Sequence, residues 1–178
     1  MAERWKKNRT DRLTKLARAI ELLGERDQNL LSESSRVDRL RIEGAVALHA
    51  LCREFTEALN GKLTSPAVVL DPADYRAEHF NDGVPGLFQI NLRGRLLQLE
   101  FEATEELYSK EEFRRPYVLF GTVRSFNQDF LTHNTVGEKS IFYCPEGAGG
   151  KWYFFENRTY GSGEVNTDFF IGELQELL

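Results

Sequence analysis

Residues 88–102 read FQINLRGRLLQLEFE, and this stretch decides the fold class. Apolar side chains occupy every second position in the runs 88–92 and 97–101, which flank Gly94. A period of two residues is typical of a strand with one buried face and one face in water. A glycine between two such runs marks a tight turn. The stretch therefore predicts an antiparallel β-hairpin.

Further strands are expected on both sides of this hairpin. Short runs rich in β-branched and aromatic residues predict them at residues 67–70, 117–126, 140–143 and 152–155. Together with the hairpin they would form an antiparallel sheet of about five to six strands. The acidic segment 104–113 is predicted to be a short helix.

Helical spacing dominates the first third of the sequence and returns at its end. Apolar residues at intervals of three and four predict two helices, over residues 10–29 and 33–60, with Ser32 and Ser34 offering a new N-cap between them. A C-terminal helix is expected after Asn166.

Helices, then hairpin-connected strands, then a helix form the element order of an α+β protein. We expect residues 1–30 to be an N-terminal helical arm and residues 31–178 to be a single α+β domain. The second and last helices should pack on one face of the sheet.

The composition is that of a globular protein in a reducing compartment. The 178 residues are 41% hydrophobic and 29% charged with a net charge of −5, which excludes disordered and collagen-like classes. No run reaches the ~18 apolar residues of a membrane helix, and no apolar signal-peptide segment follows the basic N-terminus. Cys52 and Cys144 are too few for a disulfide framework. We therefore expect a cytoplasmic protein with no membrane partner.

Familiar catalytic and cofactor motifs do not fit this sequence. The segment 144–151, CPEGAGGK, lacks the first glycine of a P-loop and the Ser or Thr that follows its lysine. No H-E-x-x-H, C-x-x-C or G-x-S-x-G pattern occurs. We therefore expect no metal and no cofactor, and the sequence assigns no catalytic residue.

Aromatic residues concentrate in the later predicted strands and suggest a ligand site. Tyr117 and Trp152 are candidates for lining a pocket, with Arg124, His133 and Cys144 as polar participants. A cysteine at a strand end serves as a nucleophile only beside a base such as a histidine. The interpretation that we favour for most of these aromatic residues is instead that they fill a core on both faces of a central strand.

The first 18 residues carry seven Lys or Arg against two acidic residues. Such a segment can bind phosphates or an anionic surface. The candidate anion-binding residues are Arg4, Lys6, Lys7, Arg9 and Arg12. The acidic charge of the whole chain argues against a nucleic-acid-binding domain, which is usually basic.

A narrow apolar stripe on the same helix indicates a different role. Leu13, Leu16, Ile20 and Leu23 recur at alternating intervals of three and four, the spacing of a coiled-coil seam. The leading interpretation is a non-catalytic binding or assembly module that forms a homodimer. One alternative is a small-molecule-binding protein or small enzyme with an aromatic-lined pocket. The other is an anion or nucleic-acid binder that acts through the basic helix.

Overall fold

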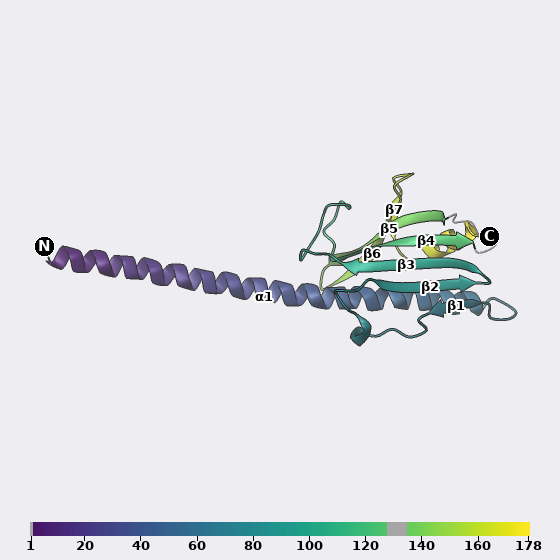
Figure 1. The fold of residues 1–178 in the computed structure, drawn as a ribbon, viewed down its shortest axis with the longest axis horizontal. Coiled ribbons are helices and arrows are strands. Elements are labelled where there is room, and N and C mark those ends of the chain that lie inside the picture. The colour runs from purple at the N-terminus through teal and green to yellow at the C-terminus, as the bar shows by residue number, and fades with distance from the viewer. Residues whose placement is uncertain (1, 128–134) are drawn as a thin grey trace. The chain divides into compact units, whose positions relative to one another are not determined.

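The computed structural model describes the backbone of residues 2–127 and 135–178 and the side chains of residues 10–127 and 137–178. The chain divides into two compact units, Met1–Arg36 and Val37–Leu178. We call the first the arm and the second the body. Helix α1 (Ala2–Asn60) contributes residues to both units, and helix α2 (Thr167–Gln175) belongs to the body (Figure 1).

The expectation of two N-terminal helices, over residues 10–29 and 33–60, was wrong, because α1 is one continuous helix. Ser32 and Ser34, the expected caps, lie inside this helix, so no new helix begins there. The Ser35 hydroxyl donates to the Leu31 carbonyl one turn earlier (3.0 Å), as a serine does inside a continuing helix. Gly24 destabilises a helix by only about 1 kcal/mol relative to alanine, and α1 contains no proline.

The sheet confirms the α+β class and extends it. Each strand pairs antiparallel with its neighbour in sequence, in the spatial order β1 to β7 (Figure 1). The strands are β1 (Val68–Asp71), β2 (Gly86–Leu92), β3 (Arg95–Ala103), β4 (Leu119–Asn127), β5 (Thr135–Glu146), β6 (Gly149–Phe155) and β7 (Ser162–Glu164). The described residues thus form seven strands rather than the five to six expected. Sequence reasoning missed β7 because its three residues surround Gly163 and resemble a turn.

The hairpin predicted from residues 88–102 is confirmed. Strands β2 and β3 pair in a register that sets Leu92 opposite Arg95. Arg93 and Gly94 between them have φ values of 48° and 90°. Positive φ at both turn residues is what a two-residue hairpin needs to match the twist of its strands.

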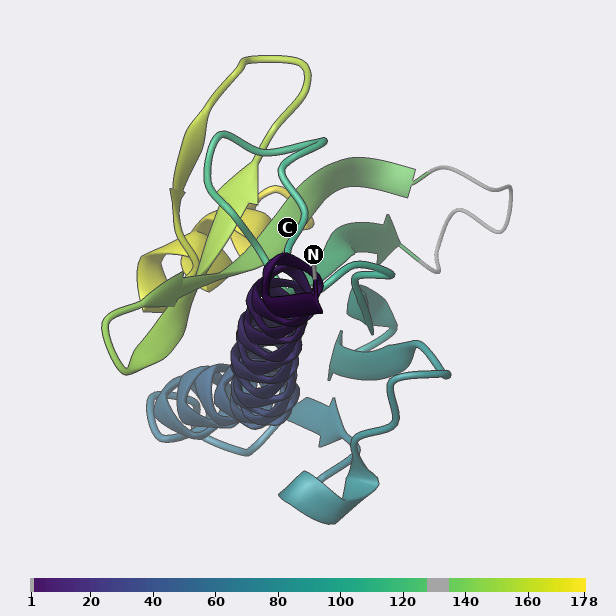
Figure 2. The same ribbon diagram turned by 90° about the vertical axis from the view of Figure 1, so that its left-hand side faces the viewer.

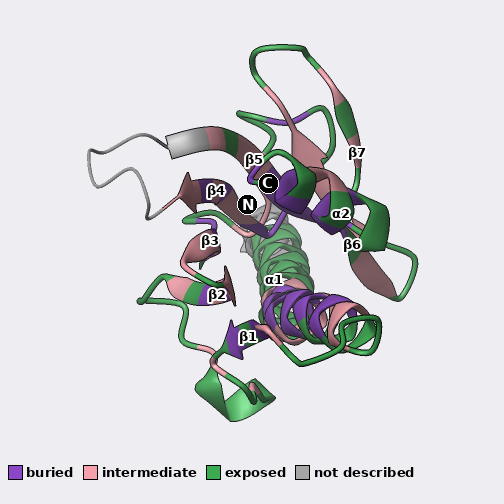
Figure 3. Cartoon of the chain, turned by 90° about the vertical axis from the view of Figure 1, so that its right-hand side faces the viewer, coloured by how far each residue is buried: buried purple, intermediate pink, exposed green. Residues whose placement is uncertain are grey.

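Both helices of the body lie on one face of the sheet, which we call the inner face (Figures 2 and 3). Alternating strand residues meet α1 from Val37 onward and α2, and the largest fully buried side chains of this core include Trp152, Phe88, Phe101, Phe170, Leu40 and Leu48. The C-terminal helix is confirmed. The Asn166 side chain accepts a hydrogen bond from the Phe169 amide (3.1 Å) and caps it.

A glycine lets α1 approach the sheet closely. A Cβ atom at Gly44 would lie 2.6 Å from the ring of Tyr143, so a larger residue there would push the helix away. The Gly44 carbonyl also accepts a hydrogen bond from Trp152 Nε1 (2.7 Å), which satisfies the buried indole. This position therefore fixes where α1 crosses β5 and β6.

Asn60 joins the end of α1 to the start of β1. Its Oδ1 accepts hydrogen bonds from the amides of Ala67 and Val68, both at 3.0 Å. Its Nδ2 donates to the Val68 carbonyl (2.8 Å). One side chain thus closes the loop between the helix and the first strand.

Candidate functional site

The most distinctive surface of the arm is an apolar row that we call the arm stripe. It consists of Leu13, Leu16, Ile20, Leu23 and Leu30, which are each between 53% and 59% exposed. A single exposed leucine is ordinary, but a row at coiled-coil spacing is not. The stripe can bury itself only against another helix or another apolar surface.

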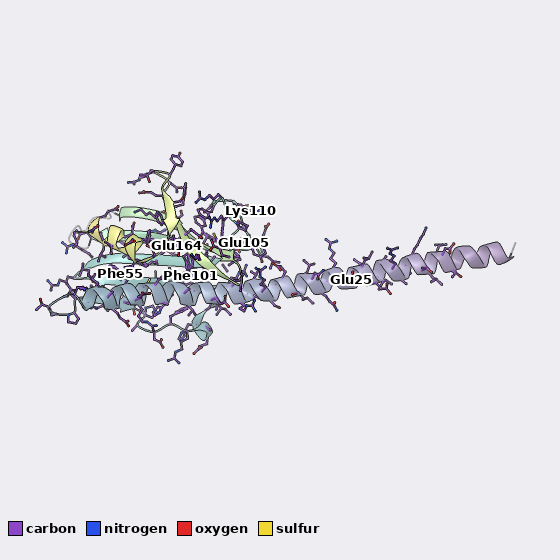
Figure 4. All side chains as sticks on the ribbon, turned by 180° about the vertical axis from the view of Figure 1, so that it is seen from behind. Glu25, Phe55, Phe101, Glu105, Lys110 and Glu164 are labelled. Atoms are coloured by element: carbon purple, nitrogen blue, oxygen red, sulfur yellow. The ribbon has the colours of Figure 1, made fainter. Side chains whose placement is uncertain are left out.

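The structure lengthens the stripe that the sequence predicted. Because α1 continues past residue 29, Leu30 falls in line with Leu23, and Asp27 occupies the position between them. Sequence reasoning missed Leu30 because it ended the helix too early. The side chain of Glu25, labelled in Figure 4, extends from the surface of the helix.

A second aromatic cluster lies on the opposite, outer face of the sheet. It is formed by buried Phe113, Tyr117, Phe142 and Cys144. The rings of Phe113 and Phe142 stack with their centroids 4.7 Å apart. The short helix expected over residues 104–113 does not form, and this segment instead carries Phe113 onto the outer face. The aromatic residues therefore fill space on both faces, as the favoured interpretation held.

The segment that carries Phe113 is anchored by a buried arginine of α1. Arg41 donates to the carbonyl oxygens of Thr104 (2.7 Å) and Glu106 (3.0 Å) and to Asp82 Oδ2 (3.3 Å). Glu105 and Lys110 of this segment are labelled in Figure 4. This anchor could not be predicted from the sequence, because the hydrogen-bond partners of Arg41 are 41 to 65 positions away.

Cys144 sits in a poor environment for a nucleophile. Burial raises the pKa of its thiol to about 12, and the nearby Arg115 only partly opposes this effect. The thiolate is the reactive form, so the thiol is inert near neutral pH. His133, the base that the sequence proposed for it, lies outside the described residues.

The other predicted pocket residues do not share one cavity. Arg124 lies on the outer face, where it pairs with Glu100 (3.3 Å) and Glu138 (3.0 Å) from the two neighbouring strands. It lines a cavity of about 210 Å³. Trp152 is buried in the inner core, on the face opposite to Cys144. The sheet therefore separates Trp152 from the other described candidates, and of these it brings Tyr117 and Cys144 together in the outer cluster.

The anion-binding candidates fall on the first turns of α1. Arg12 is exposed. The backbone of Arg4, Lys6, Lys7 and Arg9 belongs to the helix, and their side chains lie outside the described residues. Anion binding by this segment stays a prediction.

An apolar pocket lies in the body, where the end of α1, helix α2 and the β2–β3 turn meet. Its volume is about 520 Å³. Phe55 (labelled in Figure 4), Leu59 and Leu174 form part of its wall, with Arg93 and Arg95 at the turn. This volume falls within the range of small-molecule sites.

A second pocket of about 510 Å³ has an acidic lining that includes Glu102, Glu105 and Glu112. Clustered carboxylates bind a cation only where several oxygens converge. Among the described residues, no group of three or more His, Cys, Asp or Glu side chains is placed to hold a metal ion. The acidic lining is an exposed surface to which the end of β3 and residues 104–118 both contribute.

A buried ion pair holds α2 to the sheet. Lys139 of β5 donates to Glu173 of α2, and Glu176 lies 3.6 Å from the same ammonium group. Burial raises the pKa of Glu173, and the charge of Lys139 opposes that rise. Both groups are enclosed in the body, so their role is structural.

Within residues 2–127 and 135–178, no helix carries an apolar stretch of the length that a membrane crossing requires. Comparison of the chain with protein-family models, with curated protein sequences and with solved structures gives no match.

Proposed function

We propose that this protein is a non-catalytic assembly module that forms a homodimer through the arm stripe. The observation that carries the proposal is the row of five apolar side chains, each more than half exposed, along one helical seam. Alternating a and d positions of this kind are the signature of helices that pair. A second copy of the same helix offers a matching surface, and closed two-fold pairing is the commonest form of self-association.

The body supports a non-catalytic role. Its cysteines are buried, and burial is the main reason that the thiol pKa of both Cys52 and Cys144 is raised. The half-buried Arg124 is already paired with two carboxylates. Arg41, Asn60 and Arg124 are thus engaged in holding strands, helices and loops together. Two free thiols also support a reducing, cytoplasmic location, which is part of this proposal.

Sedimentation velocity over a wide concentration series tests the proposal. The unmodified chain should show a reversible monomer–dimer equilibrium. Ile20→Asp places a charge in the centre of the arm stripe and should shift the equilibrium to the monomer, while urea unfolding of the body stays unchanged. A chain that remains monomeric at every concentration would overturn the proposal.

A second candidate function is small-molecule binding in the apolar pocket of the body, which the volume of about 520 Å³ and the apolar lining favour. The fluorescent probe 1-anilinonaphthalene-8-sulfonate should bind there, because it combines apolar rings with an anionic group. Ala67→Phe would fill part of the pocket, since Ala67 lines it, and should abolish the fluorescence increase. An unchanged increase would place the probe elsewhere.

A further inference from the structure

We infer that two arms pair antiparallel, with the two-fold axis crossing between Ile20 and Leu23. This inference rests on the proposed function, because it specifies how the proposed dimer is built. In heptad notation the a positions are Leu13, Ile20 and Asp27, and the d positions are Leu16, Leu23 and Leu30.

The antiparallel arrangement places each a position against a d position of the second copy. Ile20 lies against the partner's Leu23, and Leu13 lies against the partner's Leu30. Asp27 lies against the partner's Leu16. Because of the two-fold axis, each of these contacts occurs twice in the dimer. Every residue of the arm stripe from Leu13 to Leu30 therefore lies against a residue of the second copy.

Asp27 argues against the parallel arrangement. Parallel pairing sets identical a positions in one layer, which would bring two Asp27 carboxylates together inside the seam. Like charges apposed in an interface are strongly unfavourable and act against that pairing. In the antiparallel register Asp27 lies opposite the partner's Leu16, which is eleven residues from the partner's Asp27. The two carboxylates are therefore about 17 Å apart along the helix, at 1.5 Å per residue.

The charge distribution of the arm favours the same orientation. Residues 10–18 contain three basic residues and one acidic residue, a net charge of +2. Residues 25–33 contain one basic residue and three acidic residues, a net charge of −2. These two segments face each other in the proposed register. A parallel pair would instead set each segment against its own copy, with like charges adjacent.

One ion pair beside the seam makes the register testable. Arg12 and Glu33 both occupy g positions, and g positions of two antiparallel helices lie next to each other. Arg12 is exposed, and Glu33 already pairs within the helix with Arg36 at 3.6 Å. A carboxylate can accept several donors, so it can bind Arg12 of the second copy as well. In a parallel pair the neighbour of Arg12 would be Ala17.

Small residues flank the stripe on the other side. Ala17 and Gly24 occupy e positions, which face each other across an antiparallel seam. A Cβ atom built on Gly24 meets nothing within 4 Å in the free chain, so this flank of the helix is open. The two backbones can therefore approach closely along that flank.

Spin-label distances separate the two orientations. Asp11→Cys and Ser32→Cys place labels at outward-facing f positions that lie level with each other in the antiparallel register. Each variant alone should give a long distance, because its two labels are offset by about 32 Å along the helix axis, the length of 21 residues at about 1.5 Å each. An equimolar mixture should add a short distance. A parallel dimer gives the reverse pattern, with short distances for each variant alone. The unsubstituted chain, whose Cys52 and Cys144 are buried, is the labelling blank.

A charge exchange provides an independent test in the full chain. Arg12→Glu and Glu33→Arg should each raise the dimer dissociation constant roughly 5- to 20-fold, since each change sets two like-charge contacts in the dimer. The double variant R12E/E33R should recover the original value to within about threefold. A double variant that is as weak as the sum of the single variants would overturn the register.

The tests distinguish this inference from the function on which it rests. A dimer that shows short distances for Asp11→Cys alone overturns the antiparallel arrangement and leaves the assembly function standing. A chain that never dimerises overturns both. A dimer with long distances for each variant and recovery in R12E/E33R supports both.

Discussion

Replacing Leu23 by alanine should weaken the proposed dimer strongly, whereas the same replacement at Leu22 should have little effect. The two residues are neighbours on one helix and are almost equally exposed, at 57% and 58%. Only Leu23 belongs to the arm stripe. The pair therefore controls for residue type, for helix position and for exposure at the same time.

The magnitude follows from the surface that Leu23 still has to bury. Complete burial of a leucine side chain contributes about 1.5–3 kcal/mol. More than half of Leu23 remains to be buried, so each copy loses about 1–1.5 kcal/mol and the dimer loses about 2–3 kcal/mol. At 1.4 kcal/mol per factor of ten, the dissociation constant should rise roughly 30- to 150-fold.

Sedimentation velocity measures this change directly, and circular dichroism supplies the control. Alanine has the highest helix propensity, so neither variant should lose helicity through the substitution itself. Equal weakening by Leu22→Ala and Leu23→Ala would refute the stripe as the interface. So would an unchanged dissociation constant in Leu23→Ala.

The remaining predictions concern the body. Asn60→Ala should lower the free energy of unfolding by about 1–3 kcal/mol, because three backbone groups lose their partner. Lys139→Met should destabilise by about 3–5 kcal/mol at neutral pH, because it leaves Glu173 buried without its cation. Urea unfolding measures both changes. Burial raises the pKa of Glu173, so its protonated form is favoured in the folded state. The loss of stability in Lys139→Met should therefore shrink as pH falls toward the ordinary carboxyl range. It should grow as pH rises through the folded pKa of Glu173. Cys52 and Cys144 should react with Ellman's reagent only after unfolding, since both are buried.

Each of these predictions has an outcome that would contradict it. Native stability in Asn60→Ala would mean that water replaces the side chain without loss. A pH-independent deficit in Lys139→Met would mean that Glu173 stays neutral, or is solvated, in the variant. Rapid reaction of a thiol in the folded chain would show that the outer or inner cluster opens readily.

The strands were largely predictable because alternation has a clear physical cause. A strand with one face in water must alternate apolar and polar residues, and residues 88–102 do so in both strands of the hairpin. Strand β7 gives no such signal, since it is three residues long and is held by pairing with β6. Its existence depends on a neighbouring strand rather than on its own side chains.

The continuity of α1 was not predictable from capping residues alone. A serine can cap a new helix or donate to a carbonyl inside an existing one, and both uses fit the same residue. Ser35 takes the second role. The arm stripe itself was largely predictable, because its spacing of three and four residues does not depend on whether the helix ends near residue 32.

The candidate site was harder to predict because it depends on contacts between distant segments. Alternation correctly separates Trp152 from Tyr153, which pack on opposite faces. It cannot show that Phe113 crosses the outer face or that Arg124 is neutralised by residues of two other strands. Such partners become neighbours only through the register of the sheet.

The hydrogen bond between Trp152 and Gly44 spans 108 residues of sequence and has a consequence for synthesis. The inner side of α1 leaves the ribosome long before β6 exists to cover it. At a synthesis rate of about 5–20 residues per second, the part of the apolar helix face that β6 covers remains exposed to solvent for roughly 5–20 s. During that interval Leu40 and Leu48, which end fully enclosed, are open to any chaperone or neighbouring nascent chain. Production of this chain should therefore depend on chaperones that bind apolar helices during translation.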